Sequence, residues 1–208
     1  RNLTITGDYY NIEVEDVISG FPRQFSLDQC YGQGNATFCE LITRRPTATA
    51  VNSAGSIDLI NSLSVNASVL KTSGIDVTAT WFTGLGLMDN DRLSIRGAYT
   101  HILEYDFFSL PGGDADRADG EVGTSKDRFT ANVAYGTGDF RTTFTGTFIG
   151  SAYIDDQFDG SRVYEIPAEF YLDMQTTFFA GDRYEFYLGV DNLLDNDAPN
   201  ILSRQRIL

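Results

Sequence analysis

Apolar and polar residues alternate along residues 165–199. Because successive side chains of a β-strand point to opposite faces, this alternation predicts two strands joined at Gly181-Asp182-Arg183. The residues on one face are apolar, namely Phe170, Leu172, Met174, Phe178, Tyr184, Phe186, Leu188 and Val190. Most residues on the other face are polar, namely Tyr171, Asp173, Gln175, Thr177, Glu185, Tyr187, Gly189 and Asp191.

The polar face restricts the environment of these two strands. Asp173, Gln175 and Glu185 cannot lie in the core of a soluble protein without partners. Lipid on one side of the strands and water on the other satisfy both faces. The pattern is therefore typical of an outer-membrane β-barrel, in which apolar side chains point outward and polar side chains point toward the lumen.

The same alternation recurs earlier in the chain. It covers residues 3 to about 14, 66–82, 92 to about 105, 128–135 and 140 to about 149. Together with the pair of strands described above, these stretches predict about seven antiparallel strands.

The connections between these strands alternate in length. Residues 19 to about 60 predict a long irregular loop, and residues 110–121 and 155–162 predict further long polar loops. Short turns are expected at residues 84–91, 136–139 and 181–183. Outer-membrane barrels have short periplasmic turns and long extracellular loops. The fold class that we predict is therefore all-β, an antiparallel transmembrane β-barrel segment.

A sheet of seven strands is incomplete for such a barrel. Single-chain bacterial barrels have an even number of strands, and an unpaired strand edge is unfavourable in hydrocarbon. The sequence also begins inside a strand-like alternation, without a signal peptide, and ends after a loop. We therefore expect residues 1–208 to be part of a longer polypeptide that supplies neighbours for both edges.

Composition and charge narrow the class of protein. The 208 residues suffice for one domain, and 13% aromatic residues with 20 glycines favour β-structure. No apolar run approaches the roughly 18 residues of a membrane-spanning helix, which excludes a helical membrane protein. The formal net charge of -14 argues against nucleic acid as a partner.

Three short motifs occur along the chain in a particular order. They are Tyr9-Tyr10-Asn11-Ile12-Glu13-Val14 after Asp8, Gly74-Ile75-Asp76-Val77 in a predicted strand, and Val190-Asp191-Asn192-Leu193-Leu194-Asp195, with Pro199 following. In their order and spacing they resemble the C-terminal part of the barrel of TonB-dependent outer-membrane receptors. The resemblance spans nearly the whole sequence.

The resemblance implies a barrel of about 22 strands, of which residues 1–208 are the late strands. It also implies a plug domain and a TonB-contacting segment before this part, and a last strand after it. A protein of this kind is located in the bacterial outer membrane, contacts lipid, binds a siderophore, an oligosaccharide or another small molecule, and is not an enzyme. The resemblance implies no cofactor and no nucleic acid.

Aromatic residues near the predicted strand ends suit the two membrane interfaces. Those near the short turns are Trp81, Phe82, Tyr135, Phe140, Phe179 and Tyr184. Those near the long loops are Tyr99, Tyr105, Phe107 and Phe108. We predict that each set forms an aromatic girdle.

Cys30 and Cys39 are the only cysteines, and both lie in the first long loop. Two nearby cysteines in an oxidising compartment favour a disulfide. The resemblance supports this pairing, because cysteine pairs occur in extracellular loops of these receptors. No histidine or third cysteine lies nearby, so a metal site is not expected there.

Two carboxylate clusters are candidates for a calcium site, since hard cations prefer carboxylate oxygens. Their members are Asp114, Asp116, Asp119, Glu121, Asp155, Asp156 and Asp159. The spacing departs from that of an EF-hand loop, and clustered charges are usually solvated. We therefore expect polar loops rather than a metal site.

His101 is the single histidine, and it is expected near the outer interface, with Glu104 and Asp106 beyond it. A catalytic histidine needs a nucleophile within reach. The sequence contains no Gly-x-Ser-x-Gly motif and no comparable signature. We therefore interpret His101 as an interface residue and the protein as a non-enzyme.

The sequence favours an outer-membrane receptor that binds a scarce nutrient with its extracellular loops and imports it with TonB-coupled energy. Candidate ligand contacts are aromatic residues of the loops and the upper lumen, namely Phe107, Phe108, Tyr153, Phe158 and Tyr164. A passive outer-membrane porin would share the fold without TonB dependence. A soluble or cell-surface β-sandwich that binds glycans or acts as an adhesin would instead bury one face in a closed core.

Overall fold

The structure is a computed structural model that describes residues 2–20, 22–62, 64–110, 113–154, 165–181 and 183–199. The chain divides into two compact units. The first unit comprises Arg1–Ile12, Thr72–Tyr105 and Ala118–Leu208, and the second comprises Glu13–Lys71 and Asp106–Arg117.

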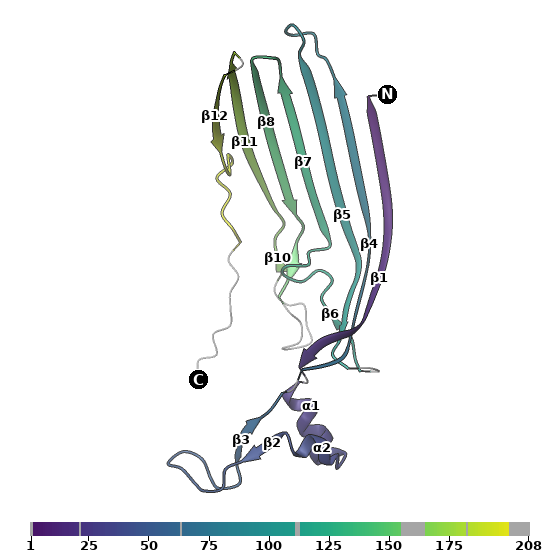
Figure 1. Cartoon of the computed structure of the whole chain (residues 1–208), viewed down its shortest axis with the longest axis vertical. Coiled ribbons are helices and arrows are strands. Elements are labelled where there is room, and N and C mark those ends of the chain that lie inside the picture. Colours follow the sequence, from purple (N-terminus) through teal and green to yellow (C-terminus); the bar gives the residue numbers. More distant parts are fainter. Residues whose placement is uncertain are drawn as a thin grey trace. The chain divides into compact units, whose positions relative to one another are not determined.

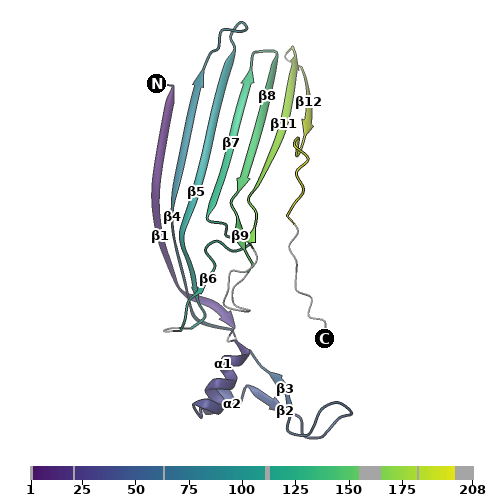
Figure 2. The same cartoon turned by 180° about the vertical axis from the view of Figure 1, so that it is seen from behind.

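One antiparallel sheet contains most of the described strands. In spatial order it consists of β1 (Leu3–Gly20), β4 (Ser64–Thr83), β5 (Arg92–Phe108), β7 (Asp127–Gly136), β8 (Phe140–Ile149), β11 (Glu169–Ala180) and β12 (Tyr184–Val190). The short strand β6 (Asp116–Arg117) pairs with β5, and β9 (Ala152–Tyr153) pairs with β10 (Glu165–Ile166). Both views show the seven long strands side by side (Figure 1, Figure 2). The predicted strands and their antiparallel arrangement are confirmed.

The first long loop is more regular than the sequence predicted. It contains α1 (Arg23–Leu27), the π-helix η1 (Asp28–Gly32), α2 (Ala36–Cys39) and the hairpin of β2 (Ile42–Arg44) and β3 (Ile57–Ile60). Local contacts, which an alternation pattern does not reveal, stabilise these short elements. For example, the Asn35 side chain accepts a hydrogen bond from the Thr37 backbone N–H at 3.2 Å and caps α2. No helix among the described residues is long and apolar enough to cross a membrane.

Strands β1 and β5 continue further than the alternation predicted, to Gly20 and Phe108. The end of β5 is still paired, with Asp106 opposite Arg117 and Phe107 opposite Asp116 of β6. Backbone pairing does not depend on side-chain polarity, so a ladder can continue where alternation stops.

The strand register confirms the two predicted faces. Side chains of directly paired residues point to the same side of a sheet. On one side, neighbouring strands align Ile95, Val133, Phe144, Met174 and Val190. On the other side they align Arg96, Asn132, Thr145 and Asp173. We call these sides the apolar face and the polar face.

The apolar face is not covered by protein. Phe144 is 37% exposed, Phe178 is 53% exposed, and Phe186 is 63% exposed. Within the described part of the chain, the only buried hydrophobic residues are Cys30, Ala152 and Ile166. The β-sandwich alternative required a closed core on this face, so the structure contradicts it.

Rows of aromatic residues cross the apolar face at two levels. One row consists of Tyr99, Phe129, Phe148 and Phe170, and the other consists of Phe140, Phe178 and Phe186. Along β8 and β11 the two rows are separated by about 27 Å at a rise of about 3.4 Å per residue. A strand tilt of about 45° reduces this height to about 20 Å, which is comparable to the apolar band of outer-membrane barrels.

The predicted girdles are only partly correct in their membership. Phe179, assigned to the girdle near the short turns, pairs with Glu185 on the polar face. The row nearer the long loops contains Tyr99, as predicted. Its other members, Phe129, Phe148 and Phe170, were not predicted to belong to a girdle. The level of a residue depends on the register between strands, which alternation along one strand does not determine.

Residues of two sequence motifs hold β1, β4 and β5 together. A Cβ atom at Gly74 would lie 2.5 Å from Cζ of Tyr10 and 2.6 Å from the backbone oxygen of His101, so only glycine allows this close approach. Two residues further along β4, the Asp76 carboxylate accepts a hydrogen bond from the Thr100 hydroxyl at 2.6 Å. These motif residues therefore have a structural role.

The third motif attaches the chain to β11 after β12 ends at Val190. Asn192 has a positive φ of 51°, which turns the backbone. Its backbone N–H donates to Oδ1 of Asp173 at 2.8 Å, and the side-chain amide of Asn196 donates to the backbone oxygen of Phe170 at 2.7 Å. The motif and Asn196, the residue directly after it, therefore hold the chain against β11 beyond the end of β12.

Asp91 organises the short turn between β4 and β5. Its carboxylate accepts hydrogen bonds from the backbone N–H groups of Leu85, Gly86 and Leu87 at 3.0, 3.1 and 2.9 Å, and from the Tyr135 hydroxyl at 3.1 Å. Desolvation raises the pKa of the Asp91 carboxyl, but the hydrogen bonds, led by that of Leu87, outweigh it. The pKa of Asp91 therefore lies below its ordinary value of 3.8.

The two faces predict different effects of a charged substitution. Ala131 lies on the apolar face between Gly97 and Gly146, and Ala134 lies on the polar face of the same strand between Ser94 and Thr143. Ala131 is two residues from Phe129 of one aromatic row, so it lies between the midplane and an interface. In the full-length protein, we expect Ala131→Arg to lower the free energy of unfolding from lipid vesicles by about 1–2 kcal/mol.

The matched control is Ala134→Arg, which should change that free energy by less than about 1 kcal/mol because its guanidinium reaches water. Urea titration followed by tryptophan fluorescence measures both variants. Equal losses for the two variants would contradict the assignment of the faces.

The turn should depend on pH through Asp91. Because the folded-state pKa is lowered, the stabilising contribution is present above 3.8 and is lost as the pH falls through the lowered pKa. We expect hydrogen-exchange protection of the Leu85 and Leu87 amides to be smaller in Asp91→Asn than in the wild type at neutral pH, and the difference to vanish in acid. Asp89→Asn, at an exposed neighbouring position, is the control. A difference that persists unchanged into acid would refute this role.

Candidate functional site

The bases of two long loops are joined to each other in the first unit. Tyr153 forms a parallel bridge with Glu121. Its N–H donates to the backbone oxygen of Gly120 at 2.8 Å, and its carbonyl accepts a hydrogen bond from the Val122 N–H at 3.0 Å. Tyr153 also pairs with Glu165 of β10. Residues 120–122 are therefore fixed to the strand pair at the base of the next loop.

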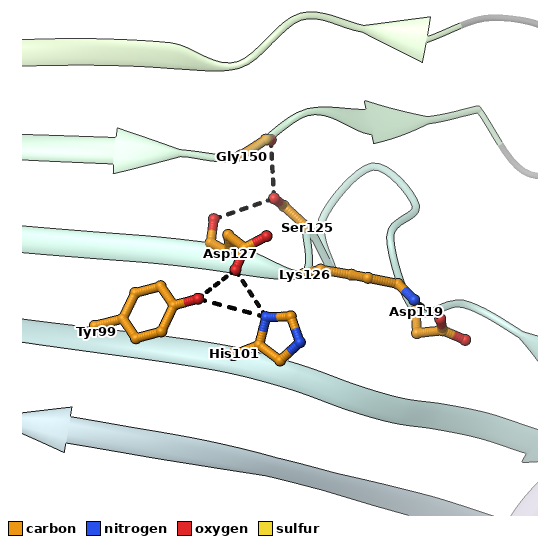
Figure 3. Close-up of polar contacts among 7 residues, drawn as sticks. All are labelled: Tyr99, His101, Asp119, Ser125, Lys126, Asp127 and Gly150. Carbon is orange, nitrogen blue, oxygen red and sulfur yellow. Dashed lines mark hydrogen bonds and ion pairs between the residues drawn. The ribbon is translucent and has the colours of Figure 1, made fainter. Parts of the chain in front are cut away.

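A small buried cluster surrounds this junction. Ala152 is 7% exposed, Ile166 is 9% exposed, and Ser125 is 2% exposed. The Ser125 hydroxyl donates to the backbone oxygen of Gly150 at 2.8 Å (Figure 3). The Gly150 N–H donates to the backbone oxygen of Asp127 at 2.8 Å. Buried backbone groups at the junction are thus hydrogen-bonded, which favours one fixed loop geometry.

Three polar side chains contact one another beside this cluster, at the end of the apolar face that is nearer the long loops. Oδ1 of Asp127 accepts hydrogen bonds from the Tyr99 hydroxyl at 2.5 Å and from Nδ1 of His101 at 2.7 Å (Figure 3). His101 donates here, because an ionised carboxylate only accepts. His101 is paired with Asp127, on the same face as the pair of Tyr99 and Phe129 and two residues nearer the long loops. Polar groups next to the aromatic row therefore satisfy one another.

The acidic partner of His101 comes from the neighbouring strand. Glu104 and Asp106 lie beyond His101 on its own strand, whereas its partner, Asp127, begins β7. The sequence does not reveal this pair, because it depends on the register between β5 and β7. The nearby Ser125 hydroxyl donates its one hydrogen mainly to the backbone oxygen of Gly150 at 2.8 Å, with a longer contact of 3.3 Å to that of Asp127, and not to His101. Among the described residues, this cluster therefore contains no serine activated by the histidine.

Three members of the first carboxylate cluster have separate side-chain or backbone partners. Asp119 is 8% exposed and forms an ion pair with Lys126 at 2.6 Å (Figure 3). Asp116 belongs to β6 and pairs with Phe107, and Glu121 bridges to Tyr153. No group of three or more potential metal ligands occurs in the described ranges. The second cluster, Asp155, Asp156 and Asp159, lies outside the described residues.

Three of the five aromatic residues proposed as ligand contacts lie within the described chain. In the second unit, Phe107 is opposite Asp116, and the Phe108 ring lies 5.7 Å from the Lys71 ammonium. In the first unit, Tyr153 belongs to the loop junction. Phe158 and Tyr164 lie outside the described residues.

The second unit contains the predicted disulfide. Cys30 and Cys39 are bonded at 2.04 Å, with their Cα atoms 4.8 Å apart, and the bond joins η1 to α2. The rings of Phe25 and Phe38 pack edge to face at 5.4 Å beside it. Covalent and aromatic contacts thus fix a short helical segment that has little apolar area to bury.

The polar face supplies hydroxyl, amide and charged groups across neighbouring strands. Its residues include Ser94, Arg96, Thr100, Thr130, Asn132, Thr145, Thr147 and Asp173. Such a surface can contact water, polar solutes or another polar protein surface.

Fold and faces together define a segment of an outer-membrane β-barrel. A family model described as TonB dependent receptor-like, beta-barrel, matches residues 1–193. The chain belongs to this family, whose members are transporters of the bacterial outer membrane and not enzymes, and which implies TonB-coupled transport. The resemblance noted in the sequence is confirmed. No curated protein and no solved structure matches the chain significantly.

The loop junction should depend on Ser125. We expect Ser125→Ala to destabilise the junction locally by about 1–3 kcal/mol, because the buried carbonyl of Gly150 loses its donor. Hydrogen exchange at the Val122 and Tyr153 amides should accelerate accordingly. Ser151→Ala changes an exposed neighbour and should have no effect. If both variants exchange like the wild type, Ser125 does not fix the junction.

Proposed function

We propose that this protein is a receptor that binds a scarce nutrient with its extracellular loops and imports it with TonB-coupled energy. Membership of the TonB-dependent receptor family carries this proposal. The joined loop bases around Tyr153 and the disulfide-linked segment support it, because loops held in one geometry bind a ligand with less loss of conformational entropy.

The proposed ligand contacts are aromatic residues of the loops. Phe107 and Phe108 end β5, and Tyr153 lies at the loop junction. Phe158 and Tyr164 are included from their positions in the sequence alone. Aromatic side chains offer large rigid surfaces that suit a siderophore, an oligosaccharide or another small ligand.

We further propose that residues 1–208 are late strands of a larger barrel domain. In the described sheet, β1 has β4 as its only neighbour and β12 has β11 as its only neighbour. Exposed edges of this kind need pairing in hydrocarbon. The plug, the segment that contacts TonB and the last strand would then lie in other parts of the polypeptide.

Nutrient uptake by cells that carry the full-length protein tests this function. A labelled siderophore or oligosaccharide should enter cells with an intact TonB system and should not enter cells that lack TonB. Phe108→Ala is expected to lower uptake about tenfold through loss of a ligand contact. Phe178→Ala, on the lipid-facing side, is the control. Uptake that is independent of TonB would support the passive porin instead.

A further inference from the structure

One arginine of the second unit is held in a fixed orientation on the protein surface. Nε and Nη2 of Arg44 donate to the Tyr31 hydroxyl at 3.2 and 2.6 Å, and Nη1 donates to the backbone oxygen of Gly55. The guanidinium carbon lies 5.3 Å from the centre of the Tyr31 ring. Arg44 remains exposed despite these contacts. Its orientation is thus set before any ligand binds.

The charge of Arg44 is not neutralised within the described residues. The adjacent Arg45 forms an ion pair with Asp58 at 2.6 Å, but no carboxylate pairs with Arg44. Its hydrogen bonds go only to a neutral hydroxyl and a carbonyl, and each terminal nitrogen carries a second N–H group. In a chain with a net charge of -14, Arg44 is a cation that the described structure orients without a carboxylate partner.

Two exposed residues with apolar surface neighbour Arg44, one in η1 and one in β3. Tyr31 is 57% exposed, and Ile57, the register partner of Arg44, is 40% exposed. Tyr31 follows Cys30, so the disulfide to Cys39 restrains the backbone that carries the ring. The guanidinium is thus oriented beside an exposed aromatic ring, and an exposed aliphatic residue is the cross-strand partner of Arg44.

We propose that Arg44 and Tyr31 form a binding site for an oxyanion, a carboxylate or a phosphate, carried by a small ligand with an apolar or aromatic body. A guanidinium fork matches the two oxygens of such a group, and the exposed ring and Ile57 contact the body. The site rests on the proposed receptor function and names the chemistry of a ligand that this function would capture.

Binding of simple probes to the purified full-length receptor in detergent tests the site. The probes are benzoate and phenyl phosphate, with benzamide as the neutral analogue of benzoate, and the readout is the apparent Kd from ligand-observed NMR titration. We expect both anions to bind more tightly than benzamide. Comparing benzoate with phenyl phosphate shows which oxyanion the site prefers.

Variants distinguish the contribution of the oriented guanidinium to anion binding from the contribution of positive charge alone. Arg44→Gln should weaken binding of both anions at least about tenfold, and Arg44→Lys should weaken it too, because lysine keeps the charge without the planar fork. Tyr31→Phe, which keeps the ring and removes the acceptor that holds the guanidinium, should weaken binding several-fold. Arg23→Gln, at an exposed arginine of α1, should leave the Kd unchanged.

Three results would overturn the site. They are absence of binding of either anion to the wild type, an unchanged Kd in Arg44→Gln, and equal binding of benzamide and benzoate. The disulfide and heat-modifiable gel mobility are checked in every variant to confirm folding. TonB dependence of uptake is measured separately in wild-type cells, so failure of the receptor function is distinguishable from failure of this site.

Discussion

Hydrocarbon offers no hydrogen-bonding partner to a polypeptide, and this constraint explains most of the described fold. Backbone groups must pair between neighbouring strands, so the chain forms long antiparallel ladders. Side chains must then separate into two sets. Phe144 lies between Val133 and Met174 on the apolar face, whereas the next residue, Thr145, is aligned with Asn132 on the polar face. Lipid takes the place of a protein core, which is why so few hydrophobic residues are buried.

The same constraint explains where polar groups occur on the apolar face. His101, Asp127 and Tyr99 lie at the upper limit of this face, next to the row that contains Phe129, and they bind one another. An unpaired carboxylate at this level would face partly desolvated surroundings. We therefore interpret the cluster as a structural feature at the end of the lipid-facing surface rather than as a catalytic site.

The two units hold their loops by different means. In the first unit, backbone pairing around Tyr153 and the buried Ser125 hydroxyl join segments that are distant in sequence. In the second unit, the disulfide of Cys30 and Cys39 and a helix cap stabilise elements too short to be stable alone. Either arrangement fixes the described segments near the loops, and a surface fixed in advance loses less conformational entropy when it binds a ligand, in keeping with the proposed receptor function.

The sequence by itself determined the strands, the two faces and the short turns, because the period of two residues is a local property that Phe170 to Val190 display without any partner. Motif order also indicated the family. Only the tertiary structure decided which residues lie at one level, such as Phe129 with Phe148, and that Asp127 is the partner of His101. These facts depend on the register between strands, and register arises from pairing across the sheet rather than from any single strand.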